Sequence, residues 1–287
     1  MPSLLPYEIY YENSAGDVLR LDRPPFVVTS CRLFDSSWKL TRSQRPLGEG
    51  GSLLARRRPA DERTMTVQAV ADDSAGLAAA LIRMSEVFDY DVIARTSGRL
   101  WVNGSYQCCW CSGSVKELSC DFPDRAQLTV TVCPEQPAWC TERSYRILGG
   151  DTVSDPGGHG YPYSYPYRYG TSRRSISLVN THFAPAPMRI TLYGPAQEPR
   201  VYVGDSCIGV NTPLHAGERV LIDQQNKLIT RTGTDGVSFN CFGDRIKNGQ
   251  TFDYAPPGST VIDLYSETLG VDIVLVEQRS EPSWVCV

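Results

Sequence analysis

The sequence predicts a mainly β protein: a β-rich α+β N-terminal domain with one helix, followed by a C-terminal antiparallel β-sandwich. Short apolar runs separated by turn residues recur through most of its 287 residues, which is typical of antiparallel strands. Helical periodicity is clear in one segment, 75–88. A segment rich in glycine, proline and tyrosine separates the two sets of runs. We therefore expect a first domain over 1–140, a connecting strap over 141–172 and a sandwich over 173–287.

In the first domain, β-strands are expected on both sides of the helix. YEIYYEN ends in the turn cluster NSAGD, and FVVTSCRLF and TMTVQAVA follow it as further strand sequences. Between the last two, 41–63 carries three glycines and six arginines against three acids and predicts a long exposed loop or a hairpin. After the helix, GRLWVNG, YQCCWC and AQLTVTVC indicate three more strands. This order predicts one helix packed on a mainly antiparallel sheet.

The helix itself is predicted by its cap and its apolar face. Asp73 or Ser74 can cap its N-terminus. Four large apolar side chains then recur at helical spacing and share one face; they are Leu77, Leu81, Met84 and Phe88.

The second domain shows no helical periodicity. From residue 173 on, short apolar runs from SISLV to DIVLVEQ alternate with turn sequences such as GDS and PPG. Strands at roughly 8–12-residue spacing predict an antiparallel sandwich. Its aromatic residues fall largely in these runs, so we expect them in the core; they are Tyr193, Tyr202, Phe239, Phe242 and Tyr265.

The stretch YPYSYPYRYG lies between the two domains. In an extended chain its five tyrosines share one face, and its two prolines remove N–H donors from one edge only. We expect an ordered inter-domain strap; a stacking platform for sugars or bases is the alternative. The strap tyrosines are Tyr161, Tyr163, Tyr165, Tyr167 and Tyr169.

Composition narrows the possible partners. The net charge of -4 argues against specific nucleic-acid binding, because domains that bind nucleic acids are usually basic. No apolar run approaches the roughly 18 residues that a membrane-spanning helix needs. The N-terminus lacks the pattern of a secretory signal, so we expect a protein made in a cytoplasm with reduced thiols and no membrane partner.

Ten cysteines raise the question of a metal site. Their spacing is irregular and lacks the paired C-x-x-C pattern of zinc sites, so we expect no metal and no cofactor. In a strand, Cys109 and Cys111 would face one side, with Cys108 and Trp110 on the other. Small buried thiols are the favoured interpretation.

No catalytic motif is present. His159, His182 and His215 stand in apparent loops, where a solvated histidine is expected. Asp263 and Asp272 flank a pair of strands, and we expect solvated strand ends rather than paired catalytic carboxylates. The sequence therefore predicts no enzyme.

The order of these features resembles the distal tail (Dit-like) protein family of tailed bacteriophages. YYENSAGDVLRL is similar to that family's opening hairpin, and GRLWVNGSYQCCW followed by AQLTVTVCPEQPAW to the end of its first domain. The tyrosine stretch and ITLYGPAQEPRVYVG, GERVLIDQQNKLI and APPGSTVI resemble later elements. The ten cysteines depart from the family pattern.

This resemblance implies a structural hub. It implies a homo-hexameric ring of first domains around the tail channel and a galectin-like sandwich on the outside. The partners implied are the tail tube protein, the tail tip or baseplate hub protein and receptor-binding or adhesion proteins. The implied location is the virion, assembled in the host bacterial cytoplasm, with no catalytic residues.

A basic loop supplies the candidate contacts of this ring. A channel that passes DNA should not hold phosphates, so we expect the loop arginines to contact a neighbouring subunit or the tube; they are Arg42, Arg45, Arg56, Arg57 and Arg58. A carbohydrate-binding module used in adsorption to host glycans is the alternative function. A β-sandwich hydrolase is disfavoured, because no nucleophile–base pair can be nominated.

Overall fold

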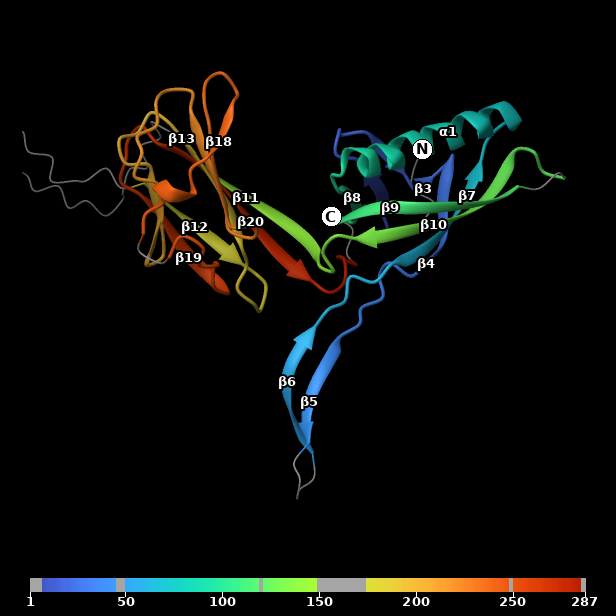
Figure 1. Cartoon of the computed structure of the whole chain (residues 1–287), viewed down its shortest axis with the longest axis horizontal. Helices are drawn as coiled ribbons and strands as arrows, with labels where there is room; N and C mark the ends of the chain where they lie inside the picture. Colours follow the sequence, from blue (N-terminus) through green and yellow to red (C-terminus); the bar gives the residue numbers. More distant parts are fainter. Residues whose placement is uncertain (1–6, 45–49, 119–120, 149–173, 248–249, 285–287) are drawn as a thin grey trace, which may run out of the picture. The chain divides into compact units, whose positions relative to one another are not determined.

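A computed structural model describes residues 7–44, 50–118, 121–148, 174–247 and 250–284. The chain divides into two compact units (Figure 1). Unit 1 comprises residues 1–141 and 278–287, and unit 2 comprises residues 142–277. The predicted fold class is confirmed, because antiparallel strands dominate and the described residues contain a single α-helix. Within the described ranges, no helix is long and apolar enough to span a bilayer.

Unit 1 is a curled antiparallel sheet with α1 against one face. Its main strand order is β11-β9-β10-β7-β4-β3, and β8 connects β9 to β1, which pairs with β2. The elements are β1 (Ile9–Glu12), β2 (Val18–Arg20), β3 (Asp22–Arg23), β4 (Phe26–Cys31), β7 (Arg63–Val70), α1 (Ser74–Ala94), β8 (Gly98–Val102), β9 (Ser105–Leu118), β10 (Arg125–Pro134) and β11 (Trp139–Ile147).

The helix follows its sequence signals. The Asp73 side chain accepts a hydrogen bond from the Gly76 N–H at 2.6 Å and so caps the first turn. Leu77, Met84 and Phe88 are buried in the core of unit 1, as their spacing predicted. The helix ends at Arg95, whose backbone adopts the left-handed conformation at φ 56°.

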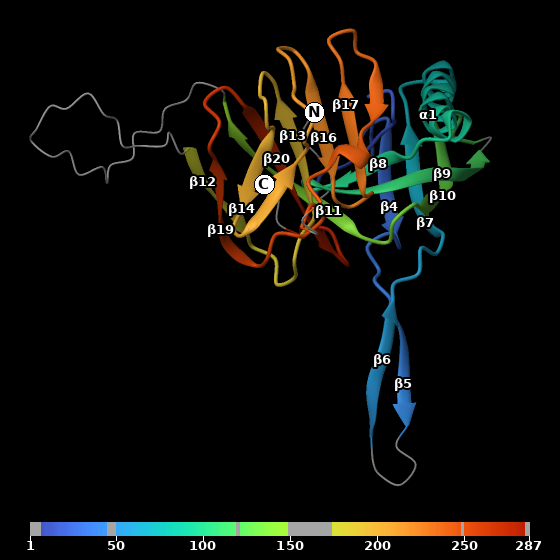
Figure 2. The same cartoon turned by 60° about the vertical axis from the view of Figure 1, so that its left-hand side comes forward.

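Unit 2 is a sandwich of two antiparallel sheets, ordered β18-β17-β16-β13-β20 and β12-β19-β14-β15 (Figure 2). Alternate residues from both sheets, such as Ile190, Val201 and Ile262, are buried between them. The strands are β12 (Arg174–Asn180), β13 (Met188–Tyr193), β14 (Arg200–Val203), β15 (Ser206–Gly209), β16 (Arg219–Asp223), β17 (Leu228–Thr232), β18 (Ser238–Asn240), β19 (Gly258–Leu264) and β20 (Gly270–Arg279), and a short 3-10 helix, η1, spans Phe242–Asp244.

The boundary between the units differs from the predicted strap. Residues 141–147 belong to strand β11, which starts in unit 1 and ends in unit 2. The chain returns to unit 1 within β20, so 278–284 do not group with the sandwich that was predicted over 173–287. The chain therefore crosses between the units in two strands. The five strap tyrosines lie outside the described residues.

Candidate assembly interface

The basic segment of unit 1 forms a hairpin. β5 (Lys39–Gln44) and β6 (Gly51–Arg57) pair only with each other, and we call these two strands the arm. Both views show the arm projecting from the rest of unit 1 (Figures 1 and 2). Every residue of β6 is exposed. A two-stranded hairpin without a core is at best marginally stable in water, so this arm has the properties of a segment that a partner covers.

The arm combines apolar and basic side chains. Leu40 lies opposite Arg56, and Leu53 lies opposite Arg42. Its leucines are open to solvent, and Leu53 and the neighbouring Leu54 are 55% and 66% exposed. The strands of the arm contain no acidic residue. The partner surface that suits the arm is therefore apolar with carboxylates around it.

The base of the arm is fixed within unit 1. The Arg58 guanidinium lies 4.9 Å from the centre of the Trp38 ring, and its Nη1 donates to the carbonyl of Arg279 at 3.0 Å. Arg56 approaches the same ring at 5.8 Å. Burial lowers the pKa of Arg58, although it leaves the residue far from neutral at physiological pH. Arg58 therefore anchors the arm.

The predicted arginine cluster thus divides by position. Arg42, Arg56 and Arg57 lie in the exposed strands of the arm, whereas Arg58 lies at its base. Arg45 lies outside the described residues. The sequence could not separate Arg58 from its neighbours, because its role depends on Trp38 and on a carbonyl 221 positions away.

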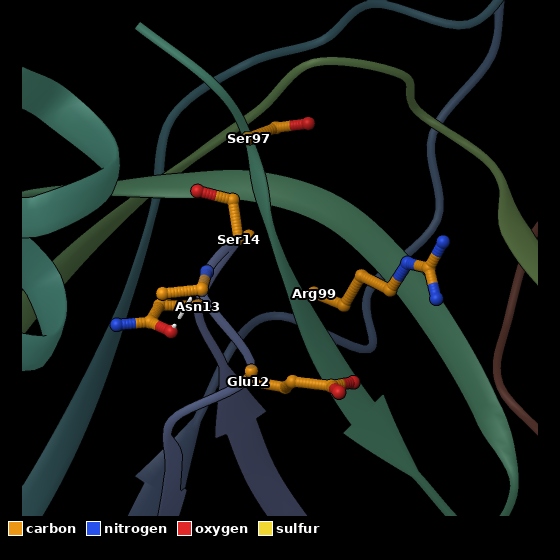
Figure 3. A pocket seen from close by; sticks show the side chains of 8 residues that line it. Glu12, Asn13, Ser14, Ser97 and Arg99 are labelled. Carbon is orange, nitrogen blue, oxygen red and sulfur yellow. Dashed lines mark hydrogen bonds between the residues drawn. The ribbon is translucent and has the colours of Figure 1, made fainter. Parts of the chain in front are cut away.

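A polar cavity of about 400 Å³ lies elsewhere in unit 1 (Figure 3). The turn after β1, from Glu12 to Gly16, forms one side, and Ser97 to Arg99 form the other. The charged groups of this cavity already have neighbours. Glu12 accepts from the Trp101 indole at 2.8 Å, and the Arg99 guanidinium lies 4.8 Å from the Tyr106 ring centre.

A buried carboxylate holds this corner of unit 1 together. Asp91, in the last turn of α1, is fully buried and accepts from the Tyr11 hydroxyl at 2.5 Å and the Ser14 N–H at 2.7 Å. Burial, Cys111 and the bond to Asp91 raise the pKa of Tyr11. A β-carbon at position 98 would overlap the Asp91 Oδ2 and Tyr11 hydroxyl oxygens, which explains why residue 98 is glycine. These groups stabilise the fold, and the Ser97 hydroxyl at the cavity wall donates to the Glu135 carboxylate at 2.5 Å.

The predicted solvation of the loop histidines and of the carboxylates is wrong at two positions. His182 is buried, and its Nδ1 accepts from the Ala184 N–H at 3.2 Å. Asp263 is buried within β19 and accepts from the Ser175 hydroxyl at 2.5 Å. In both cases a hydrogen bond compensates for burial, from the same turn for His182 and from the paired strand β12 for Asp263.

The other candidates named from the sequence are two histidines and Asp272. His215 is exposed, and His159 lies outside the described residues. Asp272 lies in the other sheet from Asp263 and accepts from the Arg146 guanidinium at 2.6 Å and from the Tyr193 hydroxyl. The two carboxylates thus occupy different sheets of the sandwich, each with its own partners.

The cysteines of β9 alternate as predicted. Cys109 and Cys111 are buried, whereas Cys108 is half-buried on the other face. All eight described cysteines are free thiols, and the described residues contain no cluster of histidine, cysteine and carboxylates able to hold a metal ion. Burial raises the pKa of Cys31 to about 11, which makes its thiol a weak nucleophile at neutral pH.

The expectation that the aromatic residues of unit 2 form its core is wrong for three of them. Phe239, Phe242 and Tyr265 are exposed, and Tyr265 packs edge-on against the half-buried Tyr202 with 5.1 Å between ring centres. Phe239 lies on the edge strand β18, Phe242 in η1 and Tyr265 directly after β19, and a single sequence does not reveal whether such positions are covered.

Comparison with known proteins places this architecture. No family model and no curated protein matches the chain. The crystal structure of the SPP1 Dit protein (gp 19.1), described as a paradigm of the hub adsorption apparatus in phages that infect Gram-positive bacteria, matches with a TM-score of 0.57 and 12% identity. The match covers 95% of this chain and 99% of that one. The chain has the fold of a phage distal tail protein.

Two phage P2 baseplate structures extend the likeness. Both show the baseplate in its activated conformation, one with Ca and one with Sr, and they match with TM-scores of 0.60 and 0.59. Each match covers 93% of this chain and 97% of the other, at 12% identity. The Dit fold therefore includes both units of the chain, and the predicted resemblance to the distal tail proteins is confirmed at the level of the fold.

Proposed function

We propose that this protein is a structural hub of a phage tail tip or baseplate that joins the tail tube to the tip and anchors receptor-binding components. The observation that carries the proposal is the extent of the match, which covers nearly all of this chain and of each structural neighbour. The non-enzymatic role follows the same likeness, because the neighbours are phage hub and baseplate proteins. Such a protein acts through assembly.

The assembly that we propose is a homo-hexameric ring. A ring needs a heterologous interface, in which one surface of a subunit binds a different surface of the next. The exposed arm of unit 1 supplies one such surface. Arg42, Arg56 and Arg57 would contact a neighbouring subunit or the adjoining tube ring, away from a lumen in which cations would retard DNA.

Electron microscopy of tailed particles tests the hub role. The experiment uses particles from a culture that encodes this chain, with a gold-labelled tag at the C-terminus. The expected result is label at the distal end of the tail tube and sixfold symmetry in averaged end views. Label on the capsid, or intact tails that lack the protein, would refute the hub role.

Charge reversal tests the contacts of the arm. Particles that carry Arg42→Glu, Arg56→Glu and Arg57→Glu together should assemble poorly or lack tails, because a basic surface becomes acidic. The matched control reverses Lys247, an exposed lysine of unit 2, to glutamate. Normal tail assembly by the triple variant would show that these arginines contact nothing essential.

Glycan binding is the second candidate function, and the contact between the half-buried Tyr202 and the exposed Tyr265 favours it. Sugar rings bind to aromatic faces flanked by polar groups; Tyr202 packs against Tyr265 and lies opposite Asp263 in the sheet. Glycan-array binding by the full chain that Tyr265→Ala abolishes, and Phe183→Ala leaves intact, would support this role. A blank array would refute it.

A further inference from the structure

Unit 1 carries an apolar groove at the start of its helix. Leu77, Ala78 and Leu81 of α1 form one side, and Leu118 and Pro123 at the ends of β9 and β10 form the other. The groove encloses about 280 Å³. Its rim is apolar as well, with Leu118 66% exposed and the neighbouring Phe122 56% exposed. A groove of this kind has room for an aliphatic side chain from outside.

Acidic residues flank the groove in the sequence, while Ser74 and Arg125 complete its lining. Five acidic residues border it in sequence and only two cations accompany them, Lys116 and Arg125. Arg125 and Asp124 pair with each other at 3.3 Å, so these two charges offset one another and four acidic residues and Lys116 are left. The acidic residues are Asp72, Asp73, Glu117, Asp121 and Asp124.

The groove and the arm are complementary in apolar surface and in charge. The arm presents exposed leucines beside basic side chains, and the groove presents an apolar floor in chain segments that carry five acidic residues. Opposite charges align two surfaces, while the leucines supply apolar area to bury. Within the described residues, no other element fills the groove or covers the arm.

The arm of one chain cannot fill its own groove. The chain returns from the arm at the start of β7, whereas the groove adjoins the residues that follow the end of β7. The eight residues of β7 separate these points by about 26 Å along the strand. Both views show the arm leading away from α1 (Figures 1 and 2).

We propose that the arm of one copy binds the α1–β9–β10 groove of the next copy, with Leu53 or Leu54 inserted between Ala78 and Leu118. The proposal rests on the ring-forming hub function and names the partner surface of the arm. Because groove and arm are different surfaces, each copy offers one of each, and the contact repeats by rotation until the ring closes.

A plug in the groove tests the contact. Ala78→Trp fills the groove from an exposed helical position, and Ala79→Trp places the same side chain one residue along, where it does not line the groove. Native mass spectrometry of the full chain over a concentration series measures assembly. The wild type and Ala79→Trp should form oligomers at equal concentrations. Ala78→Trp should need a concentration roughly tenfold higher or more, because the leucine is excluded.

A cross-link identifies the partner independently of that variant. The full chain carries p-benzoylphenylalanine in place of Leu54, and ¹⁴N- and ¹⁵N-labelled copies are mixed before irradiation. Cross-links between labels from the arm to α1 or to the start of β10 support the proposal. Cross-links within one chain or to unit 2, equal assembly of the two tryptophan variants, or a monomer at every concentration would each overturn it. The hub role is judged separately by the position of the label on particles.

Discussion

The hydrogen bond between Tyr11 and Asp91 allows a quantitative test of unit 1. Tyr11→Phe removes the hydroxyl that donates to the buried carboxylate at 2.5 Å, while the Ser14 N–H remains as a donor at 2.7 Å. Bonds to charged acceptors contribute about 1.5–3 kcal/mol, and a buried carboxylate deprived of one retains that deficit. We therefore expect unit 1 to lose about 2 kcal/mol of unfolding free energy.

Tryptophan fluorescence makes this measurement specific for unit 1. All five tryptophans lie at positions 38, 101, 110, 139 and 284, which belong to unit 1. Urea unfolding followed by their emission therefore reports that unit alone. Tyr10→Phe is the matched control, since Tyr10 lies in the same strand and its hydroxyl makes no hydrogen bond within the described part of the chain. If both variants lie within about 0.5 kcal/mol of the wild type, the Asp91 network does not stabilise unit 1.

Three further perturbations test other features. Trp38→Ala should loosen the base of the arm and speed trypsin cleavage after Arg57 by roughly threefold, since an exposed cation–π contact contributes about 0.5–1 kcal/mol; an unchanged rate would contradict the anchor. Cys31 keeps its proton to a pKa of about 11 in the fold, against 9.0 as a free thiol, so stability is full below pH 9.0 and falls between these values. Cys31→Ala should reduce the slope of unfolding free energy against pH in this range by about 1.4 kcal/mol per pH unit. An unaltered slope in urea titrations at alkaline pH would contradict the raised pKa of Cys31. Arg174→Ala should lower the unfolding free energy of unit 2 by about 3 kcal/mol, because buried carbonyl oxygens lose their hydrogen-bond donor. The unfolding transition followed by circular dichroism should shift, whereas the transition followed by tryptophan emission should not. A shift of both transitions would contradict this prediction.

Local patterns in the sequence were sufficient to predict most of the architecture. Alternating burial follows alternating hydrophobicity in β7 and β10, and the helix begins at the predicted cap. These signals are local, because a strand or a helix turn selects its inward side chains within a few residues. The expected loop or hairpin in the basic segment is the arm for the same reason.

Long-range partners were not predictable. His182 and Asp263 are buried, and their polar atoms find partners in the turn and on the paired strand β12, respectively. Conversely, Tyr265 was expected in the core but follows the end of β19 and is exposed. The two sides of a strand in a sandwich differ only through what packs on them, which a single sequence does not state.

The tyrosine stretch, which was expected to join the two domains, lies outside the described residues. The residues that flank the undescribed segment 149–173, Leu148 and Arg174, both belong to unit 2. The buried Arg174 guanidinium donates to the carbonyls of Leu148, Ser266 and Leu269, which fixes the two ends side by side. Both residues that flank the segment thus lie in unit 2, and the chain passes between the units within β11 and β20. A deletion within 149–173 should for this reason leave the unfolding of unit 1 unchanged. A proline in β11, such as Glu142→Pro, should instead destabilise the sheets of both units. Loss of the unit 1 transition in the deletion variant would support the expected role of the segment as an inter-domain strap.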